Sequence, residues 1–398
     1  MSNPGVKPRL SREVIVLGLI AFFVMVGFGV VIPVLPVFVR SFHVGYTEVG
    51  AVISAFALMR LVASPFCGKL IDWGGERTIL AIGIGIVAVS SAMVGIAQSY
   101  LEVLLLRGAG GIGSAMFSIS AMTLLLGTTD RSMRGRAVGF YQGGFLIGGM
   151  AGPALGGLLA IISLRAPFFF YAGTLVVAGV VGLAFLRPRS GRVVDATEPA
   201  PIIPFRQVLA DPRFRAACLA NFASGWASLG VRSALVPVLV VEVLHRTELW
   251  TGIAFAIAAV AQTLALGPAG KFVDTVGRRP AIIGAYALAA AVMVAIPFAG
   301  DIWMLTALLC VYGIAAAFMG TAPAAAVGDA AGARSGQPVA IFSAFSDLGA
   351  IVGPLVAGAL LDAVSYQVAF GSAVVLMLLA SVYALRMPRD RQSSSVAL

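Results

Sequence analysis

GKLIDWGGER, at residues 68–77, is a short polar turn between two long apolar runs. A related segment, GKFVDTVGRR, follows at residues 270–279, so that Gly, Lys, Asp, Gly and Arg recur in register 202 residues later. Each copy is flanked by apolar stretches long enough to cross a bilayer. A charged turn repeated in this way indicates two related halves in tandem, a layout typical of membrane transporters.

The composition excludes a water-soluble globular protein. Of the 398 residues, 60% are hydrophobic and only 11% are charged, and the mean hydropathy is +0.99. The formal net charge of +10 could suggest nucleic-acid binding. However, the basic residues are spread over short loops and do not form the single basic face that nucleic-acid binding requires. We therefore predict an integral membrane protein that does not bind nucleic acid.

Apolar runs of about twenty residues, the length that spans a hydrocarbon core, occur twelve times. The predicted spans are 13–39, 46–69, 78–99, 101–126, 136–161, 166–186, 214–243, 249–272, 280–299, 301–326, 338–363 and 366–386. A segment rich in proline and arginine separates the sixth span from the seventh. We predict an N-terminal bundle at 1–186, a cytoplasmic linker at 187–213 and a C-terminal bundle at 214–398.

The distribution of lysine and arginine predicts the orientation, because positive residues in short loops stay on the cytoplasmic side. With the N-terminus inside, only Arg40, Arg165 and Arg246 fall in outer loops, whereas most other basic residues are cytoplasmic. We predict a multi-pass protein of the cell membrane with both termini in the cytoplasm. The first apolar run is too long for a signal peptide and is expected to remain as the first span.

The repeated turn resembles the signature loop of the major facilitator superfamily. The first copy matches at Gly68, Leu70, Asp72, Gly75 and Arg77, and the second at Gly270, Asp274, Gly277 and Arg279. The resemblance implies an all-α fold of twelve spans in two pseudo-symmetric six-helix bundles. It also implies that Asp72 meets the N-terminus of span 11 and latches the cytoplasmic side shut, since a helix N-terminus favours an anion. Alternatively, these charges only anchor the loops at the lipid headgroups.

Two further stretches resemble motifs of that superfamily. Arg107 in span 4 lies where proton-driven members carry an arginine linked to proton transfer; the alternative is that it extends toward the membrane interface. The glycine-rich face of span 5 resembles the motif of exporters that exchange substrate for protons, and span 11 repeats part of it. Ordinary helix packing would also explain such glycines. The residues of this glycine-rich motif in spans 5 and 11 are Gly148, Gly152, Pro153, Gly156, Gly157, Gly353 and Pro354.

Asp347 is the one carboxylate predicted to lie deep in a span, roughly 13 Å from the cytoplasmic start of span 11 at about 1.5 Å per residue. A carboxylate at that depth must be protonated, paired or hydrated, so Asp347 is a candidate for proton coupling. The alternative is a structural ion pair with a cation such as Arg60. Candidate cavity residues on the other spans are Arg60, Arg232, Phe56, Tyr141, Gln142, Asn221, Trp226, Gln262 and Tyr312.

The first span resembles that of drug–proton antiporters but lacks the acidic residue often found there. With three deep arginines against Asp347, a cavity using these charges would suit an anionic or neutral amphipathic substrate. We expect a proton-coupled exporter of small organic or drug-like molecules. The alternatives are an uptake carrier or facilitator for an organic anion or sugar, and a membrane receptor or scaffold without flux.

No nucleophile, base and orienting group are placed together, and no metal-ligand spacing occurs, so an enzyme is not expected. We expect no cofactor and no metal. The expected partners are a small-molecule substrate, protons and membrane lipids, and the chain is expected to act as a monomer.

Overall fold

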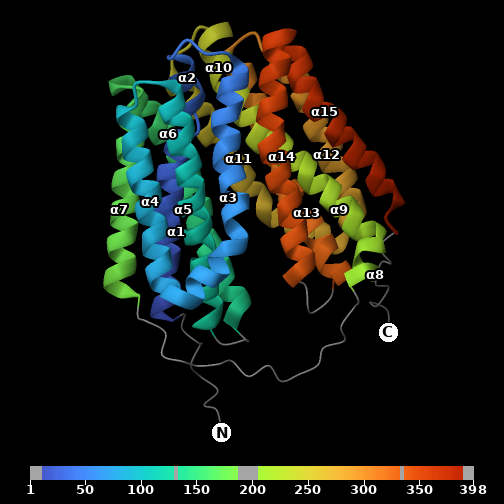
Figure 1. Cartoon of the computed structure of the whole chain (residues 1–398). Helices are drawn as coiled ribbons and strands as arrows, with labels where there is room; N and C mark the ends of the chain where they lie inside the picture. Colours follow the sequence, from blue (N-terminus) through green and yellow to red (C-terminus); the bar gives the residue numbers. More distant parts are fainter. Residues whose placement is uncertain (1–10, 130–132, 187–204, 332–335, 389–398) are drawn as a thin grey trace.

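The computed structural model describes residues 11–129, 133–186, 205–331 and 336–388, and these residues form helices without strands (Figure 1). The first half contains α1 (Arg12–Val31), α2 (Leu35–Arg40), α3 (Tyr46–Gly74), α4 (Glu76–Ile96), α5 (Tyr100–Gly127), α6 (Arg134–Ile162) and α7 (Ala166–Phe185). The second half contains α8 (Phe205–Ala210), α9 (Pro212–Ser224), η2 (Gly225–Arg232), α10 (Ser233–Val238), η3 (Leu239–Val243), α11 (Glu248–Thr275), α12 (Arg278–Ala295), η4 (Ile296–Phe298), α13 (Ile302–Ala331), α14 (Gly336–Ala363), α15 (Tyr366–Tyr383) and η5 (Ala384–Arg386). Of the predicted linker 187–213, residues 187–204 lie outside the described residues, whereas residues 205–213 contain α8 and the start of α9.

Twelve helical segments are long and apolar enough to span a membrane, which confirms the predicted number of spans. Two of them are less regular than predicted. The first span is interrupted after Val31, and α2 begins near Pro36, because proline lacks the N–H that a continuing helix would use. The seventh is one continuous segment, but it changes to wider π-helical turns at η2 and again at η3.

The repeated turns have the same backbone geometry in both halves. Gly75 has a φ of 76° and Gly277 a φ of 121°, and they are the two glycines with positive φ among the described residues. A side chain is strained in this region, so both positions favour glycine. Each of these residues ends one span or begins the next within a tight loop. The sequence repeat therefore reflects a repeated turn.

The two halves have separate hydrophobic cores. One cluster of buried side chains comes from residues between Val14 and Leu186, and the other from residues between Val208 and Met387. In Figure 1 the first half is coloured blue to green and the second half yellow to red. The halves meet mainly where α3 packs against α14 and where α6 packs against α11.

These contacts between the halves concentrate at the end of the bundle where α3 begins, hereafter the closed end. The Ser54 hydroxyl donates to the Ile351 carbonyl at 2.5 Å. A Cβ added to Gly50 would lie 2.2 Å from the Pro354 carbonyl oxygen, so only glycine allows α3 and α14 to approach this closely. In Figure 1, α3 and α14 lie side by side near the top and separate toward the bottom. The predicted orientation places the closed end outside the cell.

Polar groups tie the halves together at the closed end in a cluster that we call the closed-end cluster: Arg40, Tyr46, Thr47, Glu242 and Asp362. Arg40 Nε donates to Glu242 Oε1 at 2.9 Å, and the Tyr46 hydroxyl donates to Glu242 Oε2. The Asp362 carboxylate accepts from the backbone N–H groups of Tyr46 and Thr47 at 2.9 and 2.8 Å and from the Thr47 hydroxyl at 2.6 Å. Asp362 thus caps the N-terminus of α3 from the other half, where a helix favours negative charge.

Replacing Asp362 with Asn should weaken the closed end, because the free N–H groups of α3 lose an anionic acceptor. A loss of about 1 kcal/mol, typical for a charge at a helix terminus, would change the ratio of closed to open molecules roughly fivefold. The measurement is a spin–spin distance across the closed end between labels at Gln98→Cys and Arg246→Cys, in a chain whose native cysteines are replaced by serine. We expect the fraction of molecules with a long distance between the two labels to be larger in Asp362→Asn than in the unaltered chain.

Asp301→Asn is the matched control for this experiment. Asp301 is also an exposed aspartate that accepts from backbone N–H groups, those of Trp303 and Met304 at 2.8 Å, but within its own half. It should leave the distance distribution unchanged. Identical distributions for both variants would mean that Asp362 does not hold the halves together.

Candidate transport site

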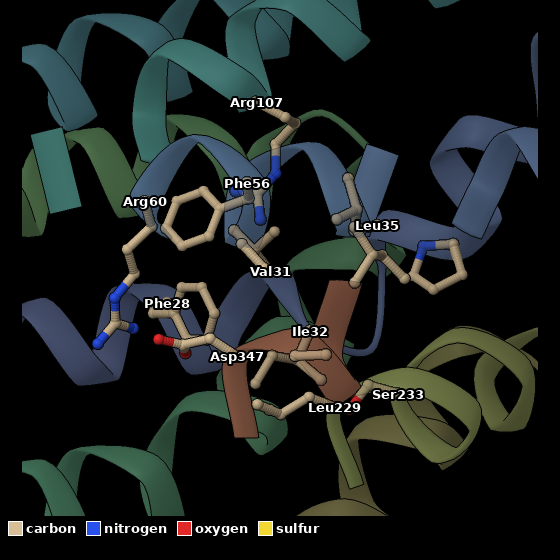
Figure 2. Close-up of a pocket in the computed structure, with 14 residues that line it drawn as sticks. Phe28, Val31, Ile32, Leu35, Phe56, Arg60, Arg107, Leu229, Ser233 and Asp347 are labelled. Carbon is tan, nitrogen blue, oxygen red and sulfur yellow. The ribbon is translucent and has the colours of Figure 1, made fainter. Parts of the chain in front are cut away.

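A central cavity of about 160 Å³ lies between the halves and is predominantly apolar (Figure 2). Helix α3 contributes one face, in which Ile53, Phe56, Ala57 and Arg60 follow the spacing of successive helical turns. The other lining residues are Phe28, Val31, Ile32, Leu35, Pro36, Arg107, Leu229, Ser233, Asp347 and Ala350. The cavity therefore draws on residues of both halves.

Asp347 and Arg60 face each other from α14 and α3 (Figure 2). The Arg60 charge acts on the Asp347 carboxylate, but no hydrogen bond or ion pair joins the two side chains. Both are half-buried. The two residues that the sequence suggested as partners are therefore brought to one cavity across the boundary between the halves, and each can still take another partner.

Arg107, on α5, also lines the central cavity. Its side chain is only 8% exposed, and its guanidinium lies 4.5 Å from the centre of the Phe56 ring. The Nε atom is buried without a hydrogen-bond partner. This position rules out an arginine that reaches out to the membrane interface. Arg107 is instead a buried positive charge that lies against the face of the Phe56 ring.

A second, wider cavity of about 600 Å³ adjoins the first, because Phe28, Ile32, Leu229 and Ser233 line both. Its walls are mainly α6 and α11, and its lining extends from Pro153 to Gly139 along α6 and from Phe255 to Leu266 along α11. These helices thus enclose a space that leads away from the closed end. Predicted cavity residues Gln142, Gln262 and Arg232 line it.

Arg232 lies at the last turn of the π-helical segment η2. Its guanidinium lies 5.3 Å from the ring centres of both Phe255 and Tyr312, and its Nε is buried without a hydrogen-bond partner. The Tyr312 hydroxyl forms a 2.7 Å hydrogen bond with Ser228, which fixes the ring beneath the guanidinium. Arg232 is half-buried, but it resembles Arg107 in that its guanidinium lies beside an aromatic ring and its Nε atom is buried.

Four predicted cavity residues line neither cavity and pack within the halves instead: Tyr141, Asn221, Trp226 and Tyr312. Tyr141 is 3% exposed and packs edge-on against Phe145. Asn221 donates to the Phe342 carbonyl at 2.7 Å, and the Trp226 indole N–H donates to Ser372 at 3.1 Å. The polar groups of Asn221 and Trp226 join neighbouring helices, and the Tyr312 hydroxyl is hydrogen-bonded to Ser228, so these groups are not available to a ligand in this structure.

The lining residues that sequence reasoning missed are mainly apolar. Phe28 and Leu229 line both cavities, and Phe255 lies under Arg232. Phe255 and Gln262 are seven residues apart and so share one face of α11, a spacing that could have identified Phe255 from the sequence. Nothing in the composition of the first span distinguishes Phe28 from its neighbours.

The glycine-rich faces of spans 5 and 11 are packing surfaces in both halves. Cβ atoms added to Gly148, Gly152 and Gly156 would lie 2.6, 2.6 and 2.2 Å from backbone atoms of α1. In the second half, a Cβ on Gly353 would lie 2.9 Å from backbone atoms of Trp226 in η2. The motif thus allows α6 to approach α1, and α14 to approach η2, at backbone distance. Its link to transport direction stays a prediction.

The predicted latch is not engaged in this structure. Asp72 is exposed and has no hydrogen bond or ion pair with another described residue. Arg77 donates to the Leu183 carbonyl within its own half. In the second copy, Arg278 forms a 2.9 Å ion pair with Asp329, and Asp274 lies 3.9 Å from Arg278. Here the halves meet at the closed end, so a latch at the other end would belong to the opposite conformation.

Comparison with known proteins identifies the family. The sequence profile of the Major Facilitator Superfamily matches residues 17–258 and 217–397, which together cover most of the chain. The chain belongs to the Major Facilitator Superfamily. Members of this family are transporters and not enzymes, and the resemblance to its drug–proton antiporter branch is also supported.

The sequence relatives include multidrug transporters. The chain is 24% identical over 357 residues to quinolone resistance protein NorA of Staphylococcus aureus strain COL, covering 89% of this chain and 91% of NorA. It is 31% identical over 166 residues to multidrug resistance protein 1 of Bacillus subtilis strain 168, covering 42% of this chain and 43% of that protein. Among solved structures, the chain resembles a bacterial homologue of the human lysosomal transporter Spinster, with a TM-score of 0.79, 16% identity and coverage of 96% and 97%.

Replacing Asp72 with Asn should favour the conformation described here, because only the opposite conformation is predicted to use the latch. The measurement uses a chain whose single cysteine is Gln142→Cys, in the wider cavity. A water-soluble maleimide that enters from the end of the bundle opposite the closed end should label this cysteine faster in Asp72→Asn. The increase is at most about twofold if the two conformations are equally populated in the unaltered chain.

Asp301→Asn is the control for this prediction, since Asp301 lies outside both signature turns and accepts hydrogen bonds only within its own half. Thermal stability should be the same in both variants. A labelling rate unaffected by Asp72→Asn would show that the latch does not bias the two conformations.

Proposed function

We propose that the chain is a proton-coupled exporter of small organic, drug-like molecules in the cell membrane, with both termini in the cytoplasm. The single observation that carries this proposal is Asp347, a carboxylate that lines the central cavity between the halves and faces Arg60. Among the residues lining the two central cavities it is the one acidic group. The names of the relatives, a quinolone resistance protein and a multidrug resistance protein, support export of such molecules.

Coupling follows from the neighbours of Asp347. Ionised Asp347 is opposed by Arg60 on α3 and lies in the same cavity as Arg107 on α5. A proton that binds Asp347 removes this attraction between α14 and α3, and leaves Arg60 without a counter-charge. Because α14 and α3 belong to different halves, the proton changes the energy of bringing the halves together. Protonation and conformation are therefore linked, which is the requirement for coupled transport.

Alternating access uses the two ends of the bundle in turn. In the present structure the closed-end cluster joins the halves, and the wider cavity extends toward the end that the sequence predicts to be cytoplasmic. This conformation takes up substrate from the cytoplasm while Asp347 releases its proton there. The opposite conformation releases substrate outside and takes up a proton.

A second candidate function is uptake or facilitated diffusion of an organic anion. The observation that favours it is the excess of positive charge, because Arg60, Arg107 and Arg232 line the two cavities and Asp347 is their single acidic residue. In that case Asp347 only balances Arg60, and transport does not depend on a proton gradient.

Asp347→Asn distinguishes the two functions, because Asn keeps the shape of the side chain but cannot carry a proton. In proteoliposomes containing a pH-sensitive dye, a panel of cationic, neutral and anionic compounds is added under an imposed proton gradient. We expect substrate-dependent proton movement in the unaltered chain and at least a tenfold loss in Asp347→Asn.

Asp301→Asn, which removes an exposed carboxylate outside the cavities, serves as the control and should retain proton movement. Substrate flux that ignores the gradient and persists in Asp347→Asn would establish the facilitator. Binding of compounds without any flux in the unaltered chain would exclude both forms of transport.

A further inference from the structure

We propose that the two central cavities bind an amphipathic organic anion, whose acidic group is held by Arg107 and whose apolar body lies against the aromatic rings of the cavity. Arg232 supplies the second positive charge along the wider cavity. This inference rests on the proposed transport function, because it names the class of substrate. It concerns a group such as a sulfonate or carboxylate attached to an aromatic or aliphatic body.

The charge of the lining is the first argument. Three arginines and one carboxylate line the cavities, so positive charge remains even when Asp347 is ionised. Protonation of Asp347 makes the lining more positive still. A lipophilic cation entering this space would meet repulsion from Arg107 and Arg232, whereas an anion would meet two positive charges.

The second argument is that Arg107 and Arg232 lack partners of opposite charge in the part of the chain that the structure describes. Arg107 is 8% exposed, it points into the central cavity (Figure 2), and its Nε has no hydrogen-bond partner among the described residues. Arg232 Nε is likewise buried and unpaired. Buried arginine normally satisfies its fixed array of donors with carboxylates or carbonyl groups. An anionic ligand would supply the missing acceptors.

A comparison with another arginine of the same chain shows what a structural arginine looks like here. Arg165, at the closed end, donates from Nη1 to the Gly95 carbonyl at 3.2 Å and from Nη2 to the Ala97 carbonyl at 3.1 Å. It joins the start of α7 to the end of α4. Among the described residues, neither Arg107 nor Arg232 has such hydrogen bonds, although the Nε atom of each is buried.

The third argument is the apolar surface beside each charge. Arg107 lies over Phe56, whose ring centre is 5.8 Å from that of Phe28. Arg232 lies over Phe255 and Tyr312. A ligand that places its acidic group on a guanidinium thus finds an aromatic surface within reach of its body. Small, strongly hydrated anions would gain nothing from this surface, so the ligand is amphipathic.

The test uses three naphthalene compounds of the same size that carry a sulfonate, a carboxamide or a trimethylammonium group. The sulfonate is permanently ionised, so it does not cross bilayers by passive protonation. Binding to the purified full-length chain is measured by titration of compound fluorescence. We expect the sulfonate to bind at least tenfold more tightly than the trimethylammonium compound.

The matched variants are Arg107→Gln, Arg232→Gln and the control Arg165→Gln. The two cavity variants should weaken sulfonate binding about tenfold each and change carboxamide binding less than twofold, while the control should leave both unchanged. Arg107→Lys keeps the charge and should retain most of the sulfonate affinity, so the proposal stays testable if Arg107→Gln fails to fold. Tighter binding of the cation, or an equal loss for all three compounds, would overturn the proposal.

The outcomes also separate this inference from the proposed function. If the cation is exported with proton exchange, the exporter stands and the anionic substrate class is wrong. If the sulfonate binds through Arg107 and Arg232 but produces neither flux nor proton movement in proteoliposomes, the binding site stands and the transport function is wrong.

Discussion

The hydrocarbon interior of a membrane offers the backbone no hydrogen bonds, and this constraint determines most of the structure. The chain can cross only as helices that satisfy their own N–H and C=O groups, so its two halves can change accessibility only by moving helices against one another. To close a passage between them, two helices need contact surfaces without bulky side chains, so that their backbones can pack directly against each other. Gly50 against Pro354 and Gly252 against Pro153 provide such surfaces on the α3–α14 and α6–α11 pairs.

The closed end combines these close contacts with exposed polar groups, and the two have different consequences. The glycine contacts fix how closely the halves can approach, but apolar packing inside a bilayer gains little from the hydrophobic effect. The closed-end cluster lies near water, where Asp362 and Glu242 can exchange their protein partners for solvent. A contact of this kind is strong enough to favour one conformation by a few kcal/mol or less and weak enough to form and break reversibly.

The features that depend on local sequence were predictable. Span number follows from apolar length, and the repeated turn follows from Gly75 and Gly277, whose positive φ explains why glycine recurs there. Asp347 and Arg60, named as possible partners from the sequence, share a cavity. Side-chain direction was less predictable, since it depends on helix regularity and on neighbouring helices. The π-helical turns before Arg232 alter which residues of span 7 share a face, and Trp226 turns to Ser372 because α15 is packed beside it.

The two halves repeat the signature turn, but their cavity arginines lie at different positions in the fold. This difference bears on what the cavities bind. In the first half an arginine of α5 lies over a phenylalanine of α3, whereas in the second an arginine of η2 lies over rings of α11 and α13. A cation above an aromatic face gains about 0.5–2 kcal/mol. Placing an arginine at mid-membrane costs at least about 2.5–3.5 kcal/mol. The rings therefore offset only part of the cost of Arg107 and Arg232, and the remainder is lowered whenever a negative group enters the cavity between them.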